Sequence, residues 1–234
     1  MIGIIGANPG EVETFLKSLI LGETQTRLRH EFHRGELCGQ EVVITTSGMG
    51  KVRAAARTQF LIDHFDISRL IFVGVAGALD PHLERGDIVV CSQTMEHDFD
   101  ISAGSVSRQR GAHWYEADSQ LVQLALEAGQ RMGLGGKMHL GKVLTGDQAV
   151  NNQAHKQHLR QTFDGSCVEM EGAAVAMVCW MNKVPFALIR GISDLADESS
   201  LDDFARWFRI AAERSALLVM EILKTLPQES RLNP

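Results

Sequence analysis

Four acidic residues stand where an α/β protein places its chemistry, just after apolar runs of the chain. They are Glu11, Glu169, Glu171 and Asp194. Ligands of open α/β sheets bind outside the carboxyl ends of the strands, so the four carboxyl groups are expected to face one site. Acidic residues also cap helices and interact with helix dipoles, which is the commoner role of any one of them alone. Four such residues at successive strand ends are harder to explain as caps or solvated charges alone.

Buried strands and amphipathic helices are expected to position these acids. Apolar runs bounded by Gly or polar turns, which are typical of strands buried on both faces, span 2–7, 70–75, 88–91, 142–145 and 186–192. Apolar residues at helical spacing occur in 121–132, 170–181 and 204–222. This alternation predicts a single α/β domain with a mixed, mainly parallel, twisted sheet flanked by helices.

Other segments depart from the alternation of strand and helix. Two β-like stretches flank Cys38-Gly39-Gln40 and predict an antiparallel hairpin within 27–47. The segment 94–117 is long, polar and without period, so it is expected to be a functional or interface loop. The domain is expected to cover 1–226, with 227–234 as a frayed tail.

The composition excludes several classes of protein. The 234 residues carry a net charge of −6 and no basic run, which argues against a nucleic-acid partner and favours a small ligand. The four cysteines form no C-x-x-C pair, so we expect reduced thiols and a cytoplasmic protein. The longest apolar run, 173–181, is too short to span a bilayer, and no membrane partner is expected.

Two glycine-rich segments imitate nucleotide-binding motifs. Gly3-Ile-Ile-Gly6-Ala-Asn-Pro-Gly10 lacks the G-x-G-x-x-G spacing, and Pro9-Gly10 is expected to interrupt the opening of a helix. Gly48-Met-Gly50-Lys51 lacks the upstream glycine of a phosphate loop and is followed by Val52. His97-Asp98 and Asp100 fit a solvated loop better than a metal site, so neither a metal nor a cofactor is expected.

The motifs occur in an order that resembles a known family. They are Ile4-Ile-Gly-Ala with Glu11-Val12, Ser47-Gly-Met-Gly-Lys51-Val52, Gly74-Val-Ala-Gly77, Gly86-Asp87-Ile-Val, Gly146-Asp147, Val168-Glu-Met-Glu171 and Arg190-Gly-Ile-Ser-Asp194-Leu-Ala-Asp197. From residue 1 to about 224, the chain is similar to the methylthioadenosine/S-adenosylhomocysteine nucleosidase branch of the purine-nucleoside phosphorylase superfamily. The resemblance implies a nucleoside phosphorylase-like fold and a nucleoside substrate.

The resemblance also implies a role for each acid. Cleavage of a purine riboside passes through an oxocarbenium-like sugar, so the base must be helped to leave and a water must be supplied. Asp194 would protonate N7 of the base, with Arg190 and Ser193 holding it in place. Glu11 would activate the water, and Glu171 would bind the ribose hydroxyls and favour the cationic sugar.

Further residues are implied to contact the substrate. Met49 and Met170 would pack near the sugar, although a Met on an apolar stripe is more often core, and Phe204 would either close over the substrate or begin the buried stripe of the last helix. The remaining implied contacts are Asn8, Val75, Ala149, Val150 and Glu169.

Glu11 favours hydrolysis over phosphorolysis. A carboxylate beside the ribose would repel a phosphate dianion but suits a neutral water. Phosphorylase relatives carry a Gly-Asp-Pro-x-x-Arg segment here, and Asn8-Pro-Gly-Glu11 lacks the Arg. A phosphate-dependent phosphorylase and a non-catalytic nucleoside-binding protein stay open as alternatives.

The chain departs from the family pattern around the substrate. Val75 replaces a small hydroxyl residue, Ala149-Val150 replaces an aromatic followed by an aliphatic residue, Asn8 replaces Met, and Gly104 replaces an aromatic that reaches the neighbouring subunit's site. Either residue of Trp114-Tyr115 could replace the lost stacking surface.

These departures leave the nucleoside open. A roomier or more polar 5′ pocket keeps methylthioadenosine, S-adenosylhomocysteine, deoxyadenosine and a futalosine-like nucleoside as candidates. Asp194, in place of the Asn of relatives that select 6-oxopurines, indicates an adenine-type base. A homodimer with the 94–117 loop near its interface is implied by the family.

Overall fold

The computed structural model describes residues 1–99 and 113–227, which form one α/β domain. Parallel strands make its centre: β1 (Ile2–Gly6) lies between β4 (Gln40–Thr46) and β5 (Arg69–Ala78), and β10 (Phe186–Asp194) pairs with the other side of β5. Each residue of β1 and β10 is buried, as expected for strands covered on both faces. The predicted single-domain, mixed sheet is confirmed.

Half of the sheet closes into a ring, which the sequence did not predict. Its remaining strands are β6 (Ile88–Glu96), β8 (Met138–Thr145) and the short β9 (Cys167–Glu169). β10 pairs antiparallel with β6, β6 and β8 pair in parallel, β8 and β9 pair in parallel, and β9 returns antiparallel to β5. The ring brings the ends of β9 and β10 beside the ends of β1 and β5.

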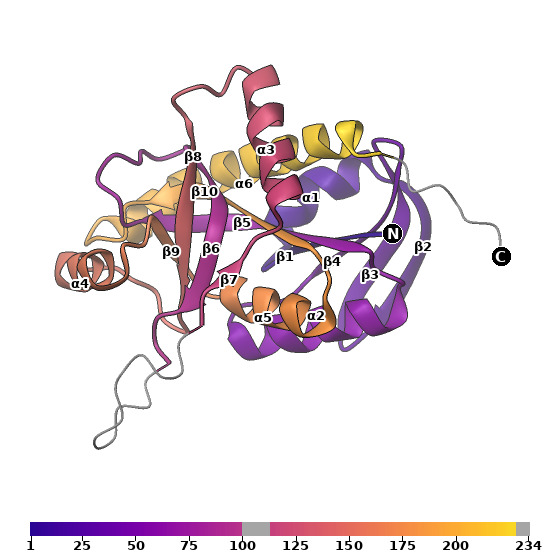
Figure 1. Cartoon of the computed structure of the whole chain (residues 1–234), viewed down its shortest axis with the longest axis horizontal. Helices are drawn as coiled ribbons and strands as arrows, with labels where there is room; N and C mark the ends of the chain where they lie inside the picture. Colours follow the sequence, from indigo (N-terminus) through magenta and orange to yellow (C-terminus); the bar gives the residue numbers. More distant parts are fainter. Residues whose placement is uncertain (100–112, 228–234) are drawn as a thin grey trace.

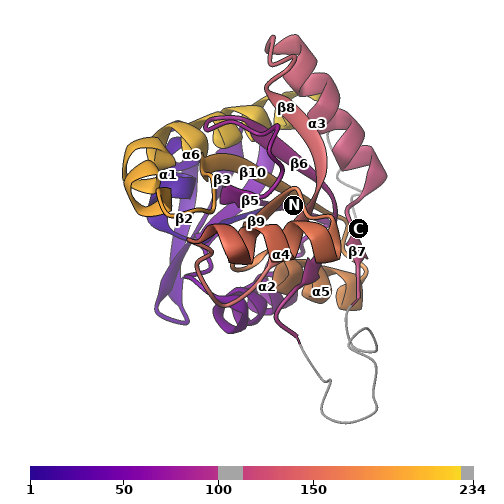
Figure 2. The ribbon, with the colours of Figure 1, turned by 90° about the vertical axis from the view of Figure 1, so that its left-hand side faces the viewer.

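Helices cover both faces of the sheet (Figure 1). α1 (Pro9–Ser18), α3 (Ser119–Arg131) and α6 (Ser200–Thr225) lie on one face, and α2 (Lys51–His64) and α5 (Gly172–Asn182) lie on the other. α4 (Gln153–Phe163) lies at one end of the domain, nearest the viewer in Figure 2. Two large hydrophobic cores, one on each face, fix the sheet between these layers.

An antiparallel extension forms the edge of the sheet. The predicted hairpin is β3 (His30–Leu37) paired with β4, and Cys38 and Gly39 make its turn with φ of 53° and 79°. Outside it lies β2 (Ile20–Arg27), which was not predicted because nearly all of its residues are exposed and it has no apolar alternation.

Two predictions about local structure need correction. Pro9 and Gly10 do not interrupt a helix; they open α1, because Pro is favoured at the first helical position, where no backbone N–H is needed. The segment 94–117 is not all loop, since β6 runs to Glu96 and Tyr115–Glu116 form strand β7 against it. Residues 100–112, with Gly104, and most of the predicted tail, 228–234, lie outside the described residues.

None of the helices in the described ranges is long and apolar enough to cross a membrane.

Candidate active site

One cavity of about 180 Å³ collects the predicted site residues at the carboxyl ends of the strands. Its walls come from the ends of β1, β5, β9 and β10, the loop between β8 and α4, and the first turn of α6. The predicted residues that line it are Asn8, Glu11, Met49, Val75, Ala149, Val150, Glu169, Met170, Glu171, Ser193, Asp194 and Phe204. Of the predicted site residues, Arg190 alone is absent from the lining, and it is buried.

Glu11 both caps a helix and faces the cavity. Its Oε2 accepts hydrogen bonds from the backbone N–H of Ala7 (2.6 Å) and Asn8 (3.0 Å), which completes the capping box of α1. Its Oε1 accepts from the N–H of Val75 at 3.1 Å. A side chain at Gly74 would stand 2.7 Å from this oxygen, so glycine there lets the carboxylate reach β5.

The carboxyl group of Glu11 is held in one position with an altered proton affinity. Burial raises its pKa, although the nearby Arg190 charge and the three backbone donors act in the opposite direction. A fixed carboxyl group with a raised pKa is suited to accept a proton from water.

Glu171 is the N-cap residue of α5 and also lines the cavity. Its Oε1 accepts a hydrogen bond from the Gly50 N–H at 2.7 Å, and Gly50 has the positive φ of 93° that favours glycine. Burial, together with the charge of Glu169, raises the pKa of Glu171 to about 8. Its other oxygen accepts no hydrogen bond from the residues that the structure describes, so it is available to a ligand hydroxyl.

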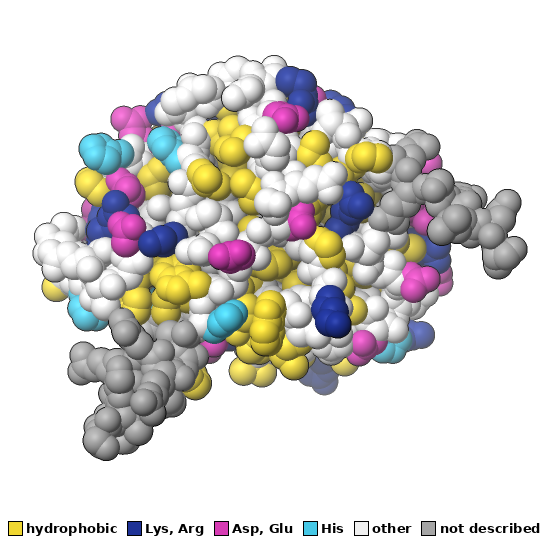
Figure 3. Space-filling model, in the orientation of Figure 1, with side chains coloured by type: hydrophobic (Ala, Val, Ile, Leu, Met, Phe, Trp, Pro, Cys, Tyr) yellow, Lys and Arg dark blue, Asp and Glu magenta, His cyan; other side chains and the backbone are white. Residues whose placement is uncertain are grey.

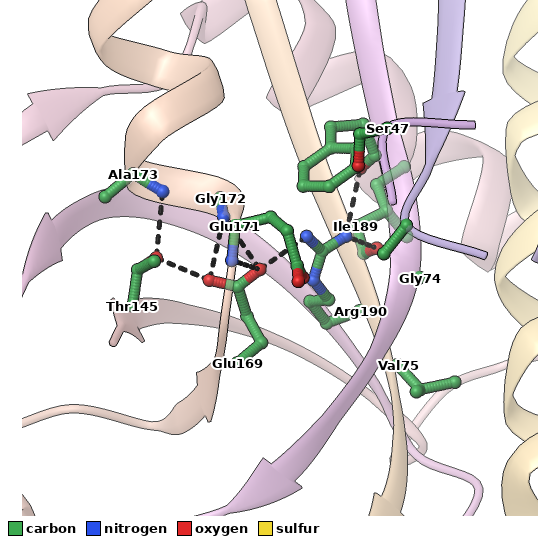
Figure 4. A network of polar contacts seen from close by, with 12 residues as sticks. Ser47, Gly74, Val75, Thr145, Glu169, Glu171, Gly172, Ala173, Ile189 and Arg190 are labelled. Carbon is green, nitrogen blue, oxygen red and sulfur yellow. Dashed lines mark hydrogen bonds and ion pairs between the residues drawn. The ribbon is translucent and has the colours of Figure 1, made fainter. Parts of the chain in front are cut away.

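Glu169 is saturated by protein donors (Figure 4). It accepts hydrogen bonds from the backbone N–H groups of Glu171 and Gly172, from Thr145 Oγ1 and, at 2.7 Å, from Arg190 Nη2. A carboxylate with this many donors has no oxygen free for a substrate hydroxyl. It positions the turn that carries Met170 and Glu171, which the sequence could not distinguish from direct binding.

Arg190 is not where the sequence analysis expected it. Its guanidinium pairs with Glu169 and lies 4.2 Å over the ring of Phe72, and Ser193, not Arg190, contacts Asp194. Burial would lower the pKa of Arg190, but the charges of Glu169, Glu11 and Glu171 raise it. One buried cation is thus shared by three carboxyl groups, an arrangement that favours further positive charge in the cavity.

Asp194 ends β10 and lines the same cavity. Its Oδ2 accepts a hydrogen bond from Ser193 Oγ at 2.8 Å, and its Oδ1 accepts from the Ala196 N–H at 2.9 Å. Burial raises its pKa, although both hydrogen bonds oppose the shift. The carboxyl group is therefore fixed, and its raised pKa favours the protonated form that a general acid needs.

The wall between the acids is apolar, with two polar exceptions that the sequence analysis missed. Gln148 and Ser200 line the cavity, next to the predicted Ala149 and Phe204. The departure at Ala149 is not compensated as expected, because neither Trp114 nor Tyr115 lines the cavity. Trp114 packs against the hydrophobic cluster that includes Leu144 and Val150, under the ammonium group of Lys142.

A polar network fastens one rim of the cavity. Lys51 Nζ contacts Asp98 Oδ1 (2.7 Å) and Glu96 Oε1 (3.2 Å). Asp98 Oδ2 accepts from the Asp147 N–H, and Asp147 Oδ1 accepts from the Lys51 N–H. The network joins the end of β6, the start of α2 and the loop that carries Gln148. Within the described ranges, no cluster of three or more His, Cys, Asp and Glu residues could hold a metal ion.

Comparison with known proteins shows which family the chain belongs to. The family model described as phosphorylase superfamily matches residues 1–224. The 5′-methylthioadenosine/S-adenosylhomocysteine nucleosidase of Tolumonas auensis is 36% identical over 231 residues, which are 96% of this chain and 99% of that protein.

Two solved structures have the same fold. The futalosine hydrolase of Helicobacter pylori has a TM-score of 0.91 and 32% identity, covering 96% of this chain and 97% of that chain. The 5′-methylthioadenosine/S-adenosylhomocysteine nucleosidase of Neisseria meningitidis, solved with methylthio-immucillin-A, also has a TM-score of 0.91 and 32% identity, covering 96% and 99%.

The fold and the acid-lined cavity thus define an α/β enzyme that acts on a small ligand at its strand ends. The chain belongs to the 5′-methylthioadenosine/S-adenosylhomocysteine nucleosidase family of the phosphorylase superfamily, as its motifs predicted.

Proposed function

We propose that the enzyme hydrolyses the N-glycosidic bond of an adenine-type nucleoside and releases the free base and a ribose derivative. The observation that carries the proposal is the convergence of Glu11, Glu171 and Asp194 on one cavity, each held by protein donors. The nucleosidase and hydrolase names of the relatives support the same class of reaction.

In this proposal, each carboxyl group acts on one part of the substrate. Asp194 gives a proton to N7 as the bond breaks, which makes the base a neutral leaving group. Glu171 accepts hydrogen bonds from the ribose hydroxyls, and the carboxylate cluster stabilises the cationic sugar. Glu11 orients a water at the anomeric carbon and takes its proton.

Charge favours water over phosphate as the nucleophile. Of the described residues that line the cavity, none is Arg or Lys, and Arg190 is already paired with Glu169. A phosphate dianion at the anomeric carbon would face Glu11 without a cation to neutralise it. This argues against the phosphorylase alternative.

The test is the release of adenine from a panel of adenine nucleosides with and without phosphate. The proposal predicts equal rates in both buffers and a reducing sugar as the second product. Strict dependence on phosphate, with a sugar phosphate as product, would establish the phosphorylase instead. Binding of a nucleoside without any turnover would favour the non-catalytic protein.

We also propose that the enzyme is a cytoplasmic homodimer. Hydrophobic side chains gather over α5 in the view of Figure 3, and Trp180 and Met181 are 60% and 63% exposed there. They line a surface hollow together with Tyr115, which belongs to the 94–117 segment expected at the interface. The four cysteines are unpaired thiols, as reducing surroundings would keep them.

A further inference from the structure

The turn that follows Asp194 places a peptide group against its carboxyl group. Ala196 donates its backbone N–H to Asp194 Oδ1 at 2.9 Å and has a φ of 52°. Residues with a Cβ are disfavoured in this left-handed region, and such backbone persists where neighbouring contacts hold it. The contacts that hold the peptide between Leu195 and Ala196 therefore also position Asp194.

Lys156 of α4 holds the other end of the same peptide. Its Nζ donates a hydrogen bond to the Leu195 carbonyl oxygen at 2.7 Å, and this contact is partly buried. The Leu195 carbonyl and the Ala196 N–H belong to one peptide group. The ammonium group, this peptide and the Asp194 carboxyl group therefore form a chain of hydrogen bonds. The members of such a chain polarise one another, so the cation makes the Ala196 N–H a stronger donor.

A second contact fixes α4 against the loop that follows Asp194. The backbone N–H of Gln153, in the first turn of α4, donates to Glu198 Oε1 at 3.1 Å. α4 buries only Leu159 among its own residues, so polar contacts such as these contribute to its position. Lys156 thus reaches the Leu195 carbonyl from a helix that is bound to the same loop at two points.

Charged groups from several segments act on Asp194. Burial raises its pKa, and the charges of Asp203 in α6 and Asp197 in the loop raise it further. Asp203 is itself paired with Arg85. Burial lowers the pKa of Lys156, whereas the charges of Asp197 and Asp194 raise it. The two neighbouring acids thus oppose the ionisation of Asp194, and the ammonium group of Lys156 favours it.

The chain of hydrogen bonds has its largest effect when the base leaves. In the proposed reaction, Asp194 gives its proton to N7 of the base and becomes a carboxylate. A carboxylate accepts hydrogen bonds more strongly than a carboxylic acid does, and the Ala196 N–H already donates to Oδ1. The positive charge of Lys156 therefore stabilises the negative charge that develops on Asp194 in the transition state.

We propose that Lys156 is a positioning residue for the general acid and acts by holding and polarising the peptide that donates to Asp194. Lys156 does not line the active-site cavity, so it acts through this peptide and not on the substrate. The inference rests on the proposed function, because it requires Asp194 as the proton donor.

The test is the dependence of kcat/KM on pH, measured as adenine release from the nucleoside of the panel that the wild type cleaves fastest. Without Lys156, the ionised form of Asp194 loses a positive charge and a strong donor, so the pKa of Asp194 rises. The protonated acid then persists to higher pH, and Lys156→Met should move the alkaline limb of the profile up by about one pH unit. It should also lower the plateau value of kcat about tenfold.

Two further variants of Lys156 separate its charge from its bulk. Lys156→Gln also removes the charge and should move the alkaline limb as far as Lys156→Met does. Lys156→Arg keeps the charge and a donor, so it should keep the wild-type limb and recover most of the lost kcat.

Arg160→Met is the matched control, because Arg160 is a cation of the same helix that also donates to a backbone carbonyl, that of Gly165, and pairs with Asp80. It should keep the wild-type limb. A limb that Lys156→Met leaves in place, or that Arg160→Met moves as far, would overturn the inference while leaving nucleoside hydrolysis intact. If the wild type releases no adenine from any nucleoside of the panel, the proposed function fails, and the inference with it.

Discussion

Asp194 is the residue whose chemistry can be removed with least disturbance. An Asn at this position can still accept the hydrogen bond from the Ala196 N–H through its amide oxygen, and its NH2 group can donate to Ser193 Oγ. It cannot donate the proton that the departing base needs. We expect Asp194→Asn to lower kcat about 10²–10⁴-fold with an unchanged melting temperature. Adenine release and thermal unfolding measure the two effects.

Asp197→Asn is the control, since Asp197 lies in the same segment but caps Ser199 and does not line the cavity. It should change kcat less than about threefold, because substitutions of surface residues usually have small effects. A similar loss in both variants would mean that the segment, and not the Asp194 proton, limits the reaction.

At the residue scale, the sequence predicted which acids would converge but not what each one touches. Glu11, Glu171 and Asp194 were predictable because they follow the ends of buried strands. The partner of Arg190 was not, because the pairing of β10 with β5 is irregular between Ile192 and Asp194, and side-chain alternation is interrupted there. Two of the four donors to Glu169, Thr145 and Arg190, come from distant segments, so the saturation of this carboxylate became visible only in the structure.

At the element scale, polar contacts fix the start of α2, where the Gly50 N–H donates to Glu171. These contacts join Lys51 to Glu96, Asp98 and Asp147. Lys51 is only 17% exposed and holds two acids at once, so its loss leaves both without their cation. We expect Lys51→Met to raise KM for the nucleoside about tenfold, because the ribose partner Glu171 loses a fixed donor. Steady-state kinetics measure this change.

Two further variants separate positioning from general destabilisation. Lys51→Arg keeps the charge and should recover most of the lost KM, whereas Lys17→Met removes an exposed lysine of α1 and should change nothing. If Lys51→Met has wild-type KM, the network does not position the ribose site.

Helices and strands were predictable from the sequence where their buried apolar residues form a run or recur at a regular spacing. The strands β1, β5 and β10 and the helices α3, α5 and α6 were recognised by their apolar runs and stripes. α2 was missed although Ala54, Thr58 and Leu61 are buried at helical spacing. α4 buries only Leu159, so its best signal is the Asn152 cap, which a sequence alone gives weakly.

At the scale of the whole molecule, the carboxylate cluster makes stability depend on pH. The pKa of Glu171 rises from 4.5 in the unfolded chain to about 8 in the folded protein. The folded state therefore binds the proton of Glu171 more tightly than the unfolded chain does. The resulting stabilisation is complete below pH 4.5 and is lost as the pH rises to about 8. Glu171→Gln cannot titrate and should lack this loss.

We therefore expect the melting temperature of Glu171→Gln, relative to the wild type, to increase between pH 5 and pH 8 and then to level off. Each pH unit in this range changes the free energy of unfolding by at most about 1.4 kcal/mol, which is a few degrees of melting temperature for a chain of this length. Thermal unfolding across this range measures the difference. A difference that does not vary with pH would mean that Glu171 is ionised throughout.

We propose that Asp194, Glu171 and Glu11 each act on a different part of one nucleoside. The most direct measurement is a crystal structure of the enzyme with adenine and a cationic ribose analogue bound. We predict Asp194 within hydrogen-bond distance of N7, Glu171 on the sugar hydroxyls, and a water between Glu11 and the cationic centre. A ligand bound elsewhere, or bound here with Asp194 turned away from the base, would contradict the account.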